Sequence, residues 1–139
     1  MARELIVEAD GGSRGNPGES GSGAVVIDAD TGEILAEIAI YGGIASNNVA
    51  EYRGMIAGVR RALELDPDAA LTVRMDSKLV VEQMSGRWKI KHPAMADLAQ
   101  EARELLTGTP VRFVWMPRLQ NSRADKLANR AMDARADLP

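Results

Sequence analysis

The chain of 139 residues contains no cysteine, a single histidine and only 4% aromatic residues. The absence of cysteine excludes a disulfide framework, a thiolate metal site and a cysteine nucleophile. With His92 alone, a zinc centre built from two histidines is excluded as well. No segment approaches the roughly 20 apolar residues of a membrane span, and the acidic N-terminus is unlike a signal peptide. We therefore expect a single-domain cytoplasmic protein without membrane association.

Charge is distributed unevenly along the chain, although the net charge is only −3. Residues 1–76 carry 6 basic and 13 acidic side chains, whereas residues 77–139 carry 11 basic and 7 acidic ones. Trp88 and Trp115 lie among the basic residues of the second part. A basic surface of this kind can bind a polyanion such as a nucleic acid, but solvated helix faces produce the same pattern.

Hydrophobic periodicity and turn residues predict the element order β-β-β-α-β-α-α-β-α. The first three strands are expected to form an antiparallel meander, and right-handed crossovers then place the last two strands parallel to the first. The fold class is therefore α/β, with a mixed five-stranded sheet flanked by helices. Strands are predicted over 3–10, 21–28, 33–42, 71–76 and 110–117, helices over 48–64, 77–86, 93–106 and 122–135, and a glycine-rich loop over 11–21.

Four acidic residues are expected at strand ends and in first helical turns. Asp10 is predicted to end the first strand and Asp76 the fourth, while Glu51 and Asp125 fall in the first turns of two helices. The carboxyl ends of parallel strands meet at one edge of a sheet, so these side chains should converge. Clustered carboxylates repel one another, and Mg²⁺ or Mn²⁺ removes that penalty through oxygen ligation. Two such ions can activate a water and stabilise the leaving oxygen of a phosphodiester.

Each of the four acids also has an ordinary structural alternative as a helix cap or a turn residue. Glu51 would pair with Asn48 as the N-cap of the first helix, and Asp125 would pair with Ser122 in the last one. Asp10 would belong to the glycine-rich turn that follows it, and Asp76 would cap the helix that follows it. Glu8 shares a strand face with the first acid and is a rival ligand.

Two polar segments flank the predicted carboxylate cluster. The glycine-rich segment does not end in G-K-[ST], so it is not a Walker A loop, but its glycines allow the backbone to approach a substrate closely. Ser46, Asn47 and Asn48 precede a helix N-terminus, where free N–H groups favour a phosphate. The amides of Asn16, Asn47 and Asn48 suit a ribose 2′-hydroxyl, although turns and caps would account for each residue alone.

Four motifs, in this order, resemble those of the type 1 ribonuclease H family. They are Asp10-Gly11-Gly12-Ser13 with Gly15-Asn16-Pro17-Gly18, then Asn47-Asn48-x-x-Glu51, then Met75-Asp76-Ser77, and last Asn121-x-x-x-Asp125. The resemblance covers residues 3–132 and is specific as a combination. It implies a ribonuclease H-like fold and an endonuclease that hydrolyses the RNA strand of RNA–DNA hybrids, leaving 5′-phosphate and 3′-hydroxyl ends.

The resemblance also implies a set of site residues. Two Mg²⁺ ions, or Mn²⁺ in their place, would be held by Asp10, Glu51, Asp76 and Asp125, with Asp10 bridging the two ions. The residues implied in hybrid binding are Gly11, Gly12, Ser13, Asn16, Ser46, Asn47, Asn48 and Lys78. Of these, Ser46 and Asn16 would hold a phosphate of the DNA strand.

The sequence departs from the family pattern at two places. Many members carry a histidine in the loop after the fifth strand, where this chain has Pro117-Arg118-Leu119-Gln120. Arg118 is the nearest substitute; it can contact a phosphate or assist product release but cannot act as a general base at neutral pH. His92 lies elsewhere, at a predicted helix start. The basic insertion of many bacterial members is reduced to residues 87–91, which indicates modest hybrid affinity.

The missing histidine and the basic second part leave a non-catalytic hybrid- or RNA-binding module on the same fold as the alternative function. A sugar or nucleotide kinase of the actin-like kind would need a longer, two-lobed chain. We expect a monomer whose partner is an RNA–DNA hybrid, with no organic cofactor. Residues 1–135 are expected to form the catalytic domain, and residues 136–139 a frayed tail or a linker to a further domain of a longer protein.

Overall fold

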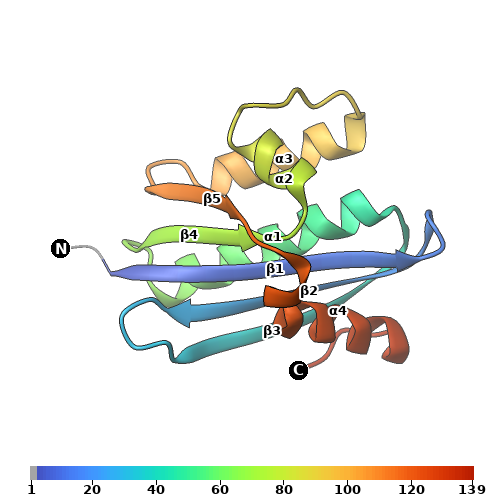
Figure 1. Cartoon of the computed structure of the whole chain (residues 1–139), viewed down its shortest axis with the longest axis horizontal. Coiled ribbons are helices and arrows are strands. Elements are labelled where there is room, and N and C mark those ends of the chain that lie inside the picture. Colours follow the sequence, from blue (N-terminus) through green and yellow to red (C-terminus); the bar gives the residue numbers. More distant parts are fainter. Residues whose placement is uncertain (1–2) are drawn as a thin grey trace.

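A computed structural model describes residues 3–139 of the chain. Its elements follow the predicted order, with one additional 3₁₀ turn, η1, that was not predicted (Figure 1). The elements are β1 (Glu4–Arg14), β2 (Gly18–Asp28), β3 (Ile34–Ala45), α1 (Asn47–Leu65), β4 (Ala70–Met75), α2 (Lys78–Met84), α3 (Pro93–Leu105), β5 (Val111–Trp115), η1 (Arg118–Gln120) and α4 (Ser122–Ala134).

The five strands form one mixed sheet in the order β3-β2-β1-β4-β5. β1 to β3 pair antiparallel as a meander, while β4 pairs parallel to β1 and β5 parallel to β4. The α/β fold class and the predicted strand directions are thus confirmed. Because β1 and β4 run the same way, their carboxyl ends lie at the same edge of the sheet.

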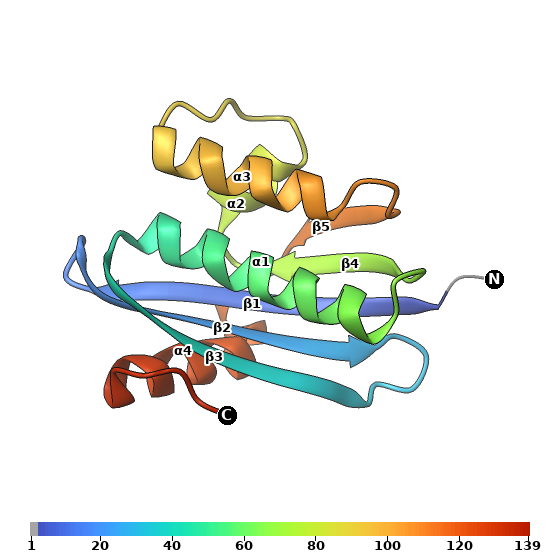
Figure 2. The ribbon, with the colours of Figure 1, turned by 180° about the vertical axis from the view of Figure 1, so that it is seen from behind.

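Helices cover both faces of the sheet. α1 and α3 lie on one face and α4 on the other (Figures 1 and 2). The interior strand β2 contributes to both cores, because Ala24 and Val26 pack in the cluster beneath α1, whereas Val25 and Ile27 pack in the cluster beneath α4. Burial on both sides explains why its second half is a continuous apolar run and not an alternating pattern.

The glycine-rich segment is not the loop that was predicted over residues 11–21. β1 continues to Arg14 and β2 begins at Gly18, so that Gly11 pairs with Ser22 and only a short turn separates the strands. Glycine is required at position 11 because a Cβ there would lie 2.2 Å from the carbonyl carbon of Ala50 in α1. Close helix packing therefore outweighs the weak strand propensity of glycine. Asp10 accordingly lies inside β1 and does not end it.

The caps of two helices differ from the predictions, although α4 begins at Ser122 as predicted. α1 begins at Asn47, and its N-cap is Ser46, whose side chain accepts a hydrogen bond from the Val49 N–H at 3.2 Å. Glu51 consequently lies in the second turn of α1 and is not the capping partner of Asn48. The N-cap of α4 is Asn121, which makes no side-chain capping bond, so Asp125 and Ser122 form no cap either.

The C-terminal residues 136–139 are not frayed. Leu138 donates its N–H to the carbonyl oxygen of Ala39 at 3.0 Å, and the Asp137 carboxylate accepts the N–H of Tyr41 at 2.8 Å. Leu138 also packs against the core beneath α4, so the tail is fastened to the edge of β3. Within residues 3–139, no helix has the length and apolar character needed to cross a membrane.

Candidate active site

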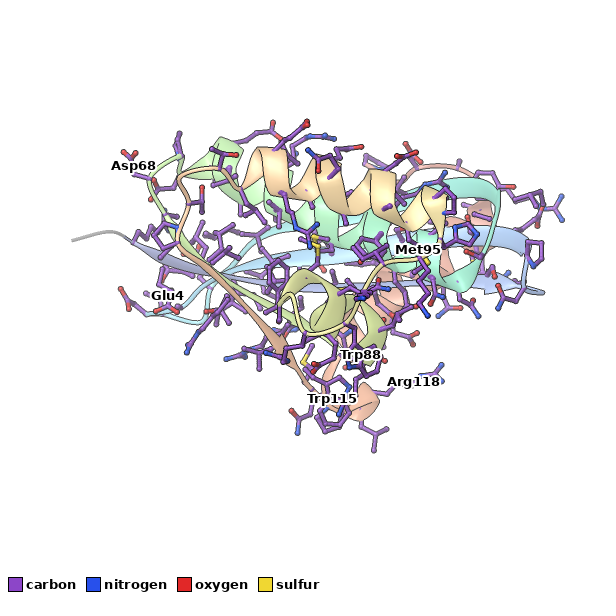
Figure 3. The ribbon with its side chains drawn as sticks, turned by 90° about the horizontal axis from the view of Figure 1, so that it is seen from above. Glu4, Asp68, Trp88, Met95, Trp115 and Arg118 are labelled. Atoms are coloured by element: carbon purple, nitrogen blue, oxygen red, sulfur yellow. The ribbon has the colours of Figure 1, made fainter. Side chains whose placement is uncertain are left out.

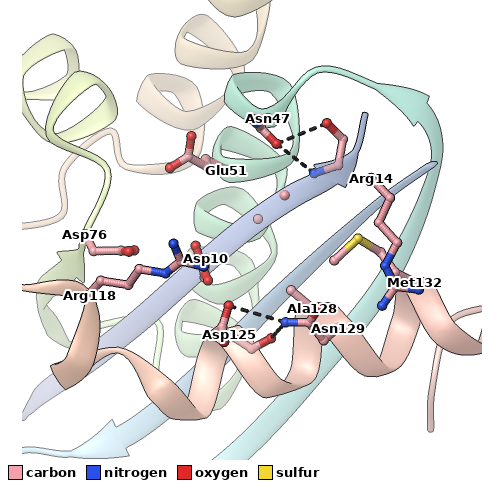
Figure 4. Close-up of a pocket in the computed structure, with 13 residues that line it drawn as sticks. Asp10, Arg14, Asn47, Glu51, Asp76, Arg118, Asp125, Ala128, Asn129 and Met132 are labelled. Carbon is pink, nitrogen blue, oxygen red and sulfur yellow. Dashed lines mark hydrogen bonds between the residues drawn. The ribbon is translucent and has the colours of Figure 1, made fainter. Parts of the chain in front are cut away.

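A polar cleft of about 370 Å³ opens where β4 ends beside β1 (Figure 4). All four predicted carboxylates line this cleft, although they come from β1, α1, the end of β4 and α4. The other predicted residues that line it are Gly11, Gly12, Ser13, Asn47 and Arg118. Asn16, Ser46, Asn48 and Lys78 are not among the lining residues. The structure therefore brings the four acids together with part of the predicted hybrid-binding residues.

Sheet register and one buried amide place the acids together. Ala9 pairs with Met75 as the last pair between β1 and β4, so Asp10 and Asp76 are the next residues on adjacent parallel strands. Asn121, only 1% exposed, donates from Nδ2 to the Ala9 carbonyl oxygen and to Asp76 Oδ1, both at 2.9 Å. This amide ties the first turn of α4, and with it Asp125, to the ends of both strands.

The cleft is electrostatically unfavourable for its own carboxylates. Burial raises the pKa of Asp10 to about 8, and the charge of Asp76 and the nearby Asp125 carboxyl add to the effect. Burial also raises the pKa of Glu51 to about 7; the Asp76 charge contributes in the same direction, and the Ser77 hydroxyl opposes it. Without a cation, the site therefore resists full ionisation near neutral pH.

Glu8, the rival ligand, is held away from this cleft by an ion pair. Its carboxylate is buried and accepts two hydrogen bonds from Arg123, from Nε and Nη2, each at 3.0 Å. The planar guanidinium matches the two carboxylate oxygens, so both are occupied. Because Arg123 lies in the first turn of α4, the pair also fastens that turn to β1 close to Asp125.

The polar residues around the turn between β1 and β2 bond mainly to one another. Asn47 Oδ1 accepts from the Ser13 N–H at 2.8 Å and from Ser13 Oγ at 3.0 Å, and Asn16 Oδ1 accepts from the Asn47 N–H at 3.1 Å. These bonds fix the turn against the N-terminus of α1. Ser13 and Asn47 thereby line the cleft in defined positions, whereas the exposed Asn16 does not line it.

The loop after β5 brings Arg118 to the carboxylates. Arg118 begins η1, lines the cleft and extends toward Asp10 (Figure 4). His92 is instead the N-cap of α3, where Nδ1 accepts the Ala94 N–H at 3.2 Å, as expected for a helix-start residue. Arg118, the nearest substitute for the family histidine in the sequence, therefore faces the carboxylates, whereas His92 does not line the cleft.

Sequence reasoning missed the far wall of the cleft. Arg14, Asn129 and Met132 line it, and Asn129 Nδ2 donates to the Asp125 carbonyl oxygen at 2.9 Å. The spacing of four residues between Asp125 and Asn129 was the available signal, since such residues share a helix face.

Within residues 3–139, no group of three His, Cys, Asp or Glu side chains is gathered closely enough to hold a metal ion as placed.

Comparison with known proteins assigns the family. The model of the reverse transcriptase-like family matches residues 8–131. The solved N-terminal ribonuclease H domain of Rv2228c from Mycobacterium tuberculosis is 53% identical, with a TM-score of 0.90 and 96% of each chain covered. Ribonuclease H1 of Halobacterium salinarum is 40% identical, with a TM-score of 0.89, and the match covers 94% of this chain and 98% of that one. The chain belongs to the type 1 ribonuclease H family.

The resemblance carried by the four motifs is thus confirmed at the level of family and fold. Another type 1 ribonuclease H, LC11, was solved in complex with an RNA/DNA hybrid; it is 37% identical, with a TM-score of 0.89 and coverage of 94% of this chain and 98% of that one. In sequence, the chain is 54% identical over 134 residues to the bifunctional protein Rv2228c. This match covers 96% of the present chain but only 36% of the length of that relative.

Proposed function

We propose that this ribonuclease H domain is an endonuclease that hydrolyses the RNA strand of RNA–DNA hybrids and leaves 5′-phosphate and 3′-hydroxyl ends. The observation that carries the proposal is the convergence of Asp10, Glu51, Asp76 and Asp125 on one cleft. Family membership supports it, since ribonuclease H relatives match nearly the whole chain. A phosphodiester is an anion, so a cleft lined by four acids needs cations before it can accept one.

The donor set of the cleft fits divalent magnesium or manganese. All four side chains are carboxylates, which are the ligands that these hard cations prefer. Burial raises the pKa values of Asp10 and Glu51 and the Asp76 charge adds to the effect, so bound cations would favour the ionised carboxylates. Asp10, Glu51, Asp76 and Asp125 would hold the ions. When bound, such ions supply activation of a water and stabilisation of the leaving oxygen.

The rest of the cleft provides contacts for the sugar–phosphate backbone. The strand backbone at Gly11 and Gly12, together with Ser13 and Asn47, faces the cleft and can bind ribose hydroxyls and phosphates. The adjoining turn and the start of α1 carry Asn16, Ser46 and Asn48. These residues would contact the DNA strand or hold Ser13 and Asn47 in place. Lys78 and the exposed residues Trp88, Lys89 and Lys91 extend a basic surface beyond α2.

Arg118 is proposed to bind a phosphate during the reaction or during product release. Its guanidinium faces the carboxylates but cannot exchange a proton near neutral pH. It would therefore compensate developing negative charge and not act as a base. Arg118→Ala should lower turnover, and Arg118→Lys should restore part of it because the positive charge is kept. Unchanged turnover and affinity in Arg118→Ala would eliminate this role.

The deciding assay uses a labelled RNA–DNA hybrid with Mg²⁺, with Mn²⁺ and with a chelator. We expect RNA fragments with 5′-phosphate ends in either metal, none with chelator, and none from Asp76→Asn. Asp97→Asn, which alters an exposed carboxylate on α3, is the matched control and should cut like the wild type. RNA duplex, DNA duplex and single strands test specificity. Hybrid binding without cleavage in any metal would instead establish the non-catalytic binding module.

A further inference from the structure

Trp115 is a large aromatic side chain that the structure leaves 48% exposed beside the proposed site. Its side chain is labelled in Figure 3. Trp115 is the last residue of β5 and pairs with Met75, the residue before Asp76. About half of this side chain is exposed to solvent, so burial alone does not account for it, and its specific contacts indicate its role.

Two contacts join Trp115 to residues of the proposed site. The indole Nε1–H donates a hydrogen bond to the carbonyl oxygen of Asp76 at 3.2 Å. The ammonium nitrogen of Lys78 lies over the indole ring, 5.9 Å from its centroid. Trp115 thus contacts both the backbone of Asp76 and the ammonium group of Lys78, which is expected to contact the hybrid.

We propose that Trp115 is a positioning residue for hybrid hydrolysis, which orients the Asp76 carboxylate through its N–H and the Lys78 ammonium through its ring. The inference rests on the proposed function. Asp76 is held at both ends in this arrangement: Trp115 fixes its carbonyl oxygen, and Asn121 fixes Oδ1 at 2.9 Å. Lys78 is otherwise an exposed, flexible side chain, and the ring limits where its charge can lie.

The two contacts can be separated by substitution. Trp115→Phe keeps an aromatic face for Lys78 but loses the N–H, so we expect kcat to fall roughly two- to fivefold with little change in KM. Trp115→Leu loses both contacts, so KM should also rise roughly two- to fivefold. In a Lys78→Met background, Trp115→Leu should raise KM no further, because the partner of the ring is already absent.

Val114→Ala is the matched control on the same strand. Its side chain lies on the opposite face of β5, so a general disturbance of this edge strand would appear in Val114→Ala as well. We expect kcat and KM of Val114→Ala to equal those of the wild type. If the control loses as much activity as Trp115→Leu, strand integrity and not positioning explains the effect, and the inference is wrong.

A second readout is independent of activity. In the metal-free protein, NMR should show the terminal methylene protons of Lys78 shifted upfield by the indole ring; the shift should persist in part in Trp115→Phe and vanish in Trp115→Leu. A Lys78 shift that is equal in the wild type and Trp115→Leu, or unchanged kcat and KM in Trp115→Leu, overturns the inference. Failure of the wild type to cut or bind hybrid would instead refute the proposed function, while the NMR comparison still tests the contact.

Discussion

Replacing Asp10 by asparagine should stabilise the metal-free domain at alkaline pH. Asp10 is only 9% exposed, and burial together with Asp76 and Asp125 raises its pKa to about 8 from the ordinary 3.8. The folded state therefore keeps a proton on Asp10 that the unfolded state has already released. Wild-type stability should fall as the pH rises from about 4 to about 8, because the unfolded state binds fewer protons across this range.

The size of the effect follows from the shift. A pKa displaced by about 4 units corresponds to a limit on the order of 5 kcal/mol once Asp10 is fully ionised, at about 1.4 kcal/mol per unit. Asp76 and Asp125 share the repulsion, and side chains relax, so we expect Asp10→Asn to gain about 2–4 kcal/mol over the wild type near pH 9. Below about pH 4 the Asp10 carboxyl is protonated in both the folded and the unfolded state, so the difference should nearly vanish.

Urea denaturation in chelator, followed at the two pH values, measures this difference. Asp97→Asn serves as the control, because an exposed carboxylate should alter stability by less than about 0.5 kcal/mol. Added Mg²⁺ should raise the stability of the wild type and raise that of Asp10→Asn much less, since the variant lacks a carboxylate ligand. If Asp10→Asn were no more stable than the wild type near pH 9, the electrostatic account of the cleft would be wrong.

Three further outcomes are expected. Gly11→Ala should cost about 3 kcal/mol of unfolding free energy in urea titrations, because its Cβ would lie 2.2 Å from a backbone atom of α1; a cost below about 1 kcal/mol would contradict the packing account. Tyr52→Phe should cost about 1–2 kcal/mol, because the buried hydroxyl, whose pKa burial raises to about 12, donates to Gln83 Oε1 at 2.7 Å; an equally stable variant would show that the bond contributes nothing. Hybrid affinity should fall steeply with salt, and Lys78→Met should reduce the slope of log affinity against log salt by about 1; an affinity independent of salt would exclude phosphate contacts.

The family and the identity of the four acids were accessible from the sequence because they depend on residue types at short spacings. Each motif is local, and periodicities of two and 3.6 residues distinguish strands from helices without knowledge of the tertiary fold. Parallel crossovers then bring Asp10 and Asp76 to one edge by general rules of chain topology. Glu51 was identified for its chemistry even though its helical turn was misplaced.

Contacts between distant residues were decided only by the tertiary structure. Gly11 belongs to a strand because α1 packs against it, and Glu8 is paired with Arg123, which is 115 residues away in the chain. The bridging role of Asn121 and the attachment of Leu138 to β3 likewise depend on partners far away in sequence. Local propensity cannot encode such pairs, since their energy exists only after the sheet and its helices have come together.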